Sequence, residues 1–153
     1  YNIYLAKYWK TVKTKTIKDG FVAAYFPDGS LCVVKSGIDY FYYPDAKKFN
    51  EATFATQRMK RYGKDIFVFG FRPQLKDNKQ SYRKGIQPYL ASKSATDEDG
   101  NLTWPGGYDY TLEELYNDPA YGCKEGSPGG AAYCTQVIFQ NGWKIPEDYP
   151  FKF

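Results

Sequence analysis

The side chains that could do acid–base chemistry in this sequence are carboxylates, because none of its 153 residues is a histidine. The lack of histidine excludes Ser-His-Asp and Cys-His catalysis and removes the commonest metal ligand. Two carboxylates can still cleave a glycosidic bond, and the candidate pairs are Glu113 with Glu114 and Asp97 with Asp109. Adjacent acids on a polar helix normally face solvent, so we predict no catalytic residue and no enzyme.

A second group of oxygen-bearing side chains lies in the stretch DEDGN. Its alternating candidates for a calcium ion are Asp97, Asp99 and Asn101. An EF-hand loop requires glycine at its sixth position and glutamate at its twelfth, where this chain has Leu102 and Tyr108. The stretch is therefore not an EF-hand. A looser calcium site that includes Asp109 and a plain solvated acidic turn both remain open, and we expect no other cofactor.

One tryptophan lies in a loop composition that favours exposure. Trp104 precedes Pro105-Gly106-Gly107, and Tyr108 follows directly. Exposed aromatic rings can contact a ligand such as a sugar, and they can equally pin a loop or enter a core. Trp104 and Tyr108 are thus candidate surface ligand contacts.

Two of the three cysteines are spaced for a disulfide. Ten residues rich in Gly, Ser and Pro separate Cys123 from Cys134, and such a loop can close without strain. A disulfide here would stabilise the fold by about 3 kcal/mol and indicate an oxidising compartment. The alternative is three reduced thiols. Cys32, between Leu31 and Val33, is expected to be a small buried side chain.

Composition predicts one sheet-rich domain spanning residues 1–153. Aromatic residues make up 20% of the chain, and there is a single methionine. Tyr and Phe favour strands, whereas a helical bundle would use more Leu and Met. The net charge of +4 comes from interspersed Lys, Arg, Asp and Glu. Because a nucleic-acid interface would cluster its positive charge, we expect no nucleic-acid partner.

The elements that must position these residues are read from periodicity and turn residues. Apolar residues at helical spacing predict an amphipathic helix over about 3–17, whose lysines face solvent or an acidic membrane surface. Strands are predicted around the Pro27–Ser30 turn and in IDYFYY, GKDIFVFGF, GIQPYL and TQVIFQ. Short helices are predicted around 51–61 and from Thr111, where Glu114 completes a capping box. We therefore expect an α+β fold, with an N-terminal helix packed on an antiparallel sheet, long loops and a disulfide-closed C-terminal region.

The C-terminal stretch resembles a known family. YGC followed by YCTQVIFQNGWKIPEDYP, which ends at Pro150, is similar to the C-terminal signature of bacterial type IV pilin-like proteins and type II secretion pseudopilins. FPDGS, GKDIFVFGF and LAKYWK are weaker matches to the same family. The family's apolar N-terminal helix is not in this chain, which starts at Tyr1 without Met, so a processed or trimmed form is expected.

The resemblance implies a structural subunit of a pilus-like or pseudopilus filament in the bacterial cell envelope. Its partners would be identical or related pilin-like subunits, and the inner membrane through the missing N-terminal helix. The C-terminal tail would be locked by Cys134 and by packing of its rigid apolar residues. These residues are Trp143, Ile145, Pro146 and Tyr149. The alternatives are a secreted or surface glycan- or host-binding module that uses aromatic loops, and a carboxylate hydrolase.

Overall fold

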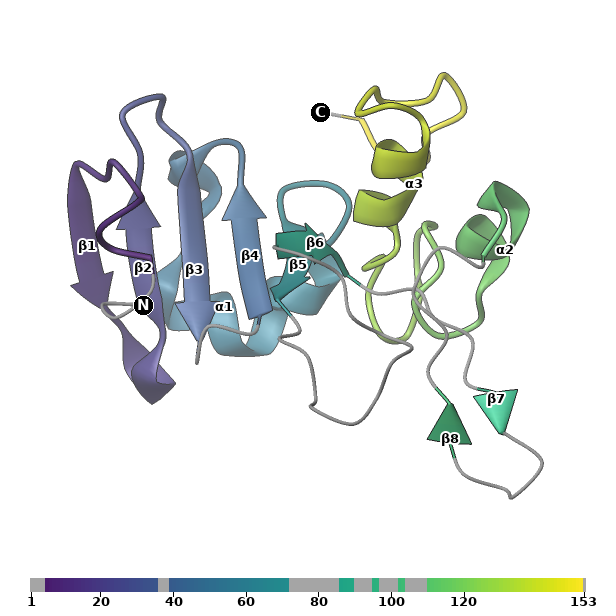
Figure 1. The fold of residues 1–153 in the computed structure, drawn as a ribbon, viewed down its shortest axis with the longest axis horizontal. Helices are drawn as coiled ribbons and strands as arrows, with labels where there is room; N and C mark the ends of the chain where they lie inside the picture. Colours follow the sequence, from purple (N-terminus) through teal and green to yellow (C-terminus); the bar gives the residue numbers. More distant parts are fainter. Residues whose placement is uncertain are drawn as a thin grey trace.

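The computed structural model describes residues 5–35, 39–71, 86–89, 95–96, 102–103 and 110–152. Six strands form one antiparallel sheet in chain order, β1-β2-β3-β4-β5-β6, so each strand pairs with its neighbour in sequence. The strands are β1 (Lys13–Thr16), β2 (Val22–Tyr25), β3 (Leu31–Lys35), β4 (Asp39–Tyr43), β5 (Phe67–Phe71) and β6 (Ile86–Pro88). A separate pair joins β7 (Ala95–Thr96) and β8 (Leu102–Thr103). Figure 1 shows the six strands side by side.

The helices are short. They are the 3-10 helices η1 (Lys18–Gly20), η2 (Ala46–Lys48) and η3 (Arg58–Arg61), and the α-helices α1 (Glu51–Gln57), α2 (Leu112–Asn117) and α3 (Cys134–Gln140). In Figure 1, α1 lies behind the sheet, and α2 and α3 lie beyond its β5–β6 edge. The Asn50 side chain caps α1 by accepting hydrogen bonds from Ala52 N and Thr53 N. The predicted capping box of Thr111 and Glu114 starts α2.

The expected N-terminal helix packed on the sheet is wrong. Leu5–Tyr8 form a turn, in which Trp9 N donates to Leu5 O at 2.9 Å, and the chain then enters β1. The range 3–17 that was predicted as one helix combines this turn with strand β1. Lys and Thr alternate through β1, and β-branched threonines favour a strand that pairs with β2 over a helix.

The predicted strand TQVIFQ is also wrong, because these residues form most of α3. A short apolar run rich in Val, Ile and Phe fits a strand or a buried helix equally well. Here Cys134 and Val137, one helical turn apart, are fully buried against Leu115 of α2. Thr135 then reaches the sheet, where its hydroxyl accepts a hydrogen bond from Val68 N at 3.0 Å. This contact joins α3 to β5 beside the end of β6.

The two faces of the sheet differ in what packs on them. The covered face holds the main core, in which the Phe41 ring meets Phe54 of α1 edge to face at 5.5 Å. Leu31, Val33 and Val68 belong to the same apolar cluster. The opposite face, called the open face below, carries a second apolar cluster of three buried residues and five partly buried ones. Its members are Cys32, Val34, Tyr40, Leu5, Trp9, Phe26, Phe69 and Phe71. In the part of the chain that the structure describes, no helix covers this face, which points toward the viewer in Figure 1.

Candidate functional site: an aromatic groove on the open face

The open face is hollowed into a groove of about 350 Å³, called the aromatic groove below. Its lining residues are Trp9, Phe26, Cys32, Tyr40, Tyr42, Phe69 and Ile86. Alternation along each strand places them together, because residues two apart on a strand point to one face. Cross-strand register then aligns Cys32 with Tyr42, and Phe71, beside Phe69 on the same face, with Ile86.

The rings of the groove pack against one another rather than filling it. Trp9 lies 5.3 Å from Phe26 and 6.1 Å from Tyr40 between ring centroids, at tilted angles. Tyr42 meets Phe69 edge to face at 6.5 Å. Such tilted and edge-to-face pairs are the favoured arrangements of aromatic rings. They give the groove walls formed by Tyr40, Tyr42 and Phe69 of strands β4 and β5 and by Trp9, which follows the N-terminal turn.

The floor of the groove is chemically inert. Burial raises the pKa of the Cys32 thiol to about 12, although a backbone hydrogen bond from Phe41 works in the opposite direction. Burial also raises the pKa of Tyr40. Both groups are therefore neutral at physiological pH, and a thiol is nucleophilic only as the thiolate. The groove suits binding of apolar groups rather than acid–base or nucleophilic chemistry.

Trp143 extends the groove with an exposed ring. Its side chain is 57% exposed, yet the ring stacks on Phe69 at 6.4 Å and meets Phe139 edge to face at 5.0 Å. Its backbone has φ +63, in the left-handed region, which costs a residue with a bulky side chain about 1–2 kcal/mol. Trp143 N donates to Ile138 O at 2.9 Å and Asn141 Nδ2 donates to Lys144 O at 3.0 Å. These bonds hold the strained backbone at Trp143, and backbone strain of this kind is concentrated at functional sites.

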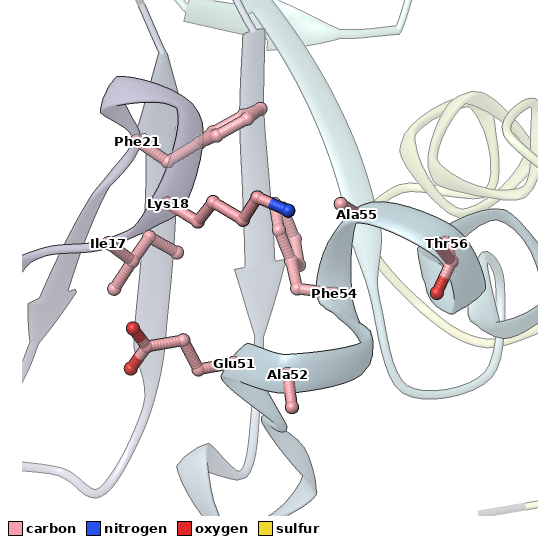
Figure 2. Close-up of a pocket in the computed structure, with 8 residues that line it drawn as sticks. All are labelled: Ile17, Lys18, Phe21, Glu51, Ala52, Phe54, Ala55 and Thr56. Atoms are coloured by element: carbon pink, nitrogen blue, oxygen red, sulfur yellow. The ribbon is translucent and has the colours of Figure 1, made fainter.

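A second hollow, of about 470 Å³, lies on the other side of the sheet between η1 and α1 (Figure 2). Its floor is formed by the buried side chains of Ile17, Phe21 and Phe54. The Lys18 side chain extends across it, and Glu51 lies at its lower edge in the view. Glu51 forms an ion pair with Lys15, and both side chains are substantially exposed. This hollow is a depression above the core whose one carboxylate is already paired.

One family model matches the sequence, over residues 1–153, and its description is a family of unknown function, DUF6613. The chain belongs to this family. Searches of curated proteins and of solved structures found no match to the chain. The description of DUF6613 names no activity, ligand or partner, so the function of this member is argued below from its residues.

The disulfide expected between Cys123 and Cys134 is present in this DUF6613 member, and both cysteines are fully buried. It joins the loop after α2 to the first residue of α3. Gly63 packs so closely on it that a Cβ at this position would lie 2.6 Å from Cys134 Sγ and 2.9 Å from Phe151. The predicted buried state of Cys32, at 5% exposure and without a disulfide partner, is confirmed.

The residues predicted to lock the C-terminal tail are placed differently from one another. Tyr149 is partly buried, and its hydroxyl donates to Gly63 O at 2.5 Å. Burial raises the pKa of Tyr149, which keeps this hydroxyl protonated as a donor. Pro146 O accepts a hydrogen bond from Tyr149 N at 3.2 Å. Trp143 and Ile145 are more than half exposed, so of these four residues Tyr149 makes the partly buried contact, and the lock of the tail stays a prediction.

The candidate calcium and ligand-contact residues lie outside the described residues. These are Asp97, Asp99, Asn101, Asp109, Trp104 and Tyr108. Of the other candidate acids, Glu114 accepts a hydrogen bond from Thr111 N at 2.8 Å as part of the helix cap, and Glu113 is exposed beside it. Within the described ranges, no three acidic or cysteine side chains are grouped so as to hold a metal ion. None of the helices in these ranges has the length and apolar character that a membrane crossing requires.

The aromatic groove was not predicted from the sequence. Its residues run from Trp9 to Ile86, and Trp143 joins it from the far end of the chain. One signal was available: GKDIFVFGF is apolar at successive positions, which indicates a strand with apolar residues on both faces. That pattern predicts that both faces of β5 are covered. It does not predict which residues of the other strands lie on the same face as each residue of β5.

Proposed function

We propose that this DUF6613 member is a non-enzymatic structural subunit of a type IV pilus-like or type II secretion pseudopilus filament at the bacterial cell envelope. The observation that carries the proposal is the aromatic groove with the exposed Trp143 ring beside it. A contiguous exposed apolar patch marks a surface that contacts another protein, a membrane or a ligand, and we take another protein as its partner. Inert side chains at its floor favour assembly over chemistry as its role.

Two further observations support an envelope location. The Cys123–Cys134 disulfide is a bond that persists in oxidising compartments such as the periplasm and the cell surface. The stretch from Tyr133 to Pro150 resembles the C-terminal signature of pilin-like proteins. The proposal concerns this role and not the pilin fold, and it includes an inner-membrane anchor encoded upstream of Tyr1 and partners that are copies or relatives of this chain.

The first test is to read the native gene upstream of the codon for Tyr1. The proposal expects a short basic leader, a processing site and then a run of about 20 apolar residues, the length that spans a bilayer as a helix. An ordinary cleaved signal peptide ending near Tyr1 would mean a free secreted domain and would overturn the proposal.

A second candidate function is a secreted or surface module that binds glycans or a host surface. The observation that favours it is the 57% exposed ring of Trp143, since a flat exposed indole offers both an apolar face and an N–H donor. Isothermal titration with a panel of oligosaccharides discriminates the two candidates. Saturable binding that is lost in Trp143→Gly supports the glycan module, and no heat with any sugar counts against it.

A further inference from the structure

We propose that a third hollow binds a short acidic segment of a partner protein. This hollow, called the basic hollow below, has a volume of about 450 Å³ and is lined by residues from 59–64, by residues from 124–131 and by Phe151. The segment places carboxylates against the lysines of the hollow and an apolar side chain beside them. The inference goes beyond the proposed function and does not depend on it, because the basic hollow shares no lining residue with the aromatic groove.

The basic hollow concentrates positive charge. Its charged lining residues are Lys60, Lys64, Lys124 and Glu125. Three positive charges and one negative charge leave a net charge of +2, which is half of the net charge of +4 carried by the whole chain. A recess with this charge is complementary to an anionic partner, and such complementarity selects the partner and speeds its association.

The lysine charges are not neutralised within the described part of the chain. Lys60 and Lys64 are exposed and form no ion pair there. The Asp65 carboxylate, which follows Lys64 in the sequence, is paired with Arg61 at 2.9 Å. Lys124 Nζ donates to the carbonyl oxygen of the last residue of α2 at 3.2 Å, and that acceptor carries no charge. Because an ammonium group has three donors, Lys124 can also donate to a carboxylate that a partner supplies.

The wall of the basic hollow is built by a loop that is tied down at both ends. Seven of the twelve lining residues lie between Cys123 and Cys134, in the loop that the disulfide closes. Gly130 lets this loop approach η3 directly, since a Cβ at this position would lie 2.4 Å from Met59 O and 2.8 Å from the Tyr62 ring. A site that is ordered before binding loses less entropy when a ligand binds, which favours recognition of a short segment.

The apolar part of the lining favours a peptide over a sugar. The Met59 side chain is 41% exposed, and methionine adapts its shape to the apolar side chain that it contacts. Tyr62 is only 8% exposed, and Phe151 is partly buried with its ring edge to face with Tyr149 at 5.9 Å. Neither ring offers the open flat face on which a sugar stacks. Lysines beside an exposed methionine instead match a segment in which glutamates flank an apolar residue.

Fluorescence anisotropy with short labelled peptides tests the site. The probes are peptides in which glutamates flank Leu, Met, Phe or Val, and matched peptides carry glutamine in place of glutamate. We expect saturable binding of at least one acidic peptide with a dissociation constant below about 1 mM. The glutamine peptides should bind at least about tenfold more weakly, and added salt should weaken the acidic peptides because it screens exposed charges.

A pair of charge-matched variants locates the binding. Lys60→Gln/Lys64→Gln removes two exposed charges of the basic hollow and should weaken the acidic peptides about fivefold or more, since each exposed ion pair contributes a few-fold in affinity. The control Lys47→Gln/Lys48→Gln removes the same charge from exposed lysines of η2 that do not line the hollow, and it leaves the dissociation constant unchanged. Amide chemical shifts measured during a titration should change most in residues 59–64 and 124–131.

The inference is overturned if no acidic peptide binds saturably up to about 1 mM, if the two variants weaken binding equally, or if the shift changes lie elsewhere. Displacement of the labelled peptide by oligogalacturonate or inorganic polyphosphate at lower concentrations than by unlabelled peptide identifies an acidic sugar or a phosphate as the ligand, and it overturns the choice of a peptide. The sequence of the gene upstream of Tyr1 tests the filament role alone, so each proposal can fail without the other.

Discussion

Removal of the disulfide is the most direct test of how the C-terminal region is held. The bond joins cysteines 11 residues apart. In the chain-entropy model, closing a loop of this size lowers the entropy of the unfolded chain enough to stabilise the fold by about 3 kcal/mol. Against a typical free energy of unfolding of about 5–15 kcal/mol, this is a large fraction.

The double variant Cys123→Ala/Cys134→Ala loses two buried sulfur atoms as well as the bond, so its total loss should be about 4–5 kcal/mol. Cys32→Ala is the matched control, because Cys32 is a buried cysteine without a disulfide. It measures the packing cost of one sulfur atom, about 1 kcal/mol. Twice this control subtracted from the double variant isolates the bond.

Urea unfolding followed by tryptophan fluorescence gives these free energies, and hydrogen exchange locates the change. We expect faster exchange in α3 and at Tyr149 N, with little change in β2 and β3, because the bond tethers α3 and the tail rather than the sheet. A urea midpoint for the double variant no lower than that of Cys32→Ala would refute the argument that the disulfide holds the C-terminal region.

Two further predictions concern Gly63 and the buried Tyr62. Gly63→Ala should lower the free energy of unfolding by about 2–5 kcal/mol, because its Cβ would meet Cys134 and Phe151 and its φ is +79. The control Gly29→Ala, at φ +86 in open space, should lower it by only about 1–2 kcal/mol in urea unfolding. Equal losses in the two variants would exclude the steric contact at Gly63 as the cause. Burial raises the pKa of Tyr62 to about 12, above the value of about 10 in an unfolded chain, so its stabilising contribution is complete below pH 10 and is lost as the pH rises toward 12. Unfolding measured across this window should show a slope that Tyr62→Phe reduces by about 1.4 kcal/mol per pH unit, and an unchanged slope would refute this assignment.

Local signals in the sequence predicted local structure well. The Pro27–Ser30 turn between two apolar runs gave the β2–β3 hairpin, in which Asp28 accepts hydrogen bonds from the backbone N–H and hydroxyl of Ser30. The helix cap at Thr111 and the disulfide were predicted for the same reason, because each depends on residues close together in the chain. The two wrong elements were segments whose pattern fitted both helix and strand, and there tertiary contacts decided.

The candidate site could not be predicted in the same way. The aromatic groove depends on which face each ring occupies, and a shift of one residue in strand register moves every side chain to the opposite face. Tyr42 and Phe69 meet on the open face only because Tyr42 pairs with Phe67. The left-handed backbone at Trp143 had no signal of its own, since the preceding Asn141-Gly142 indicated a turn but not that the turn continues through a tryptophan.

The composition of the strands predicts that another surface covers the open face. Four successive residues of β3, Leu31 to Val34, are apolar and buried, and β5 has apolar residues on both faces. Strands of this composition are typical of sheets buried between two layers, because a sheet with one wet face alternates apolar and polar residues. In the described chain, α1 supplies a layer on one side, whereas on the other side the aromatic rings line a groove. A protein surface packed on the open face would supply the second layer that this strand composition predicts.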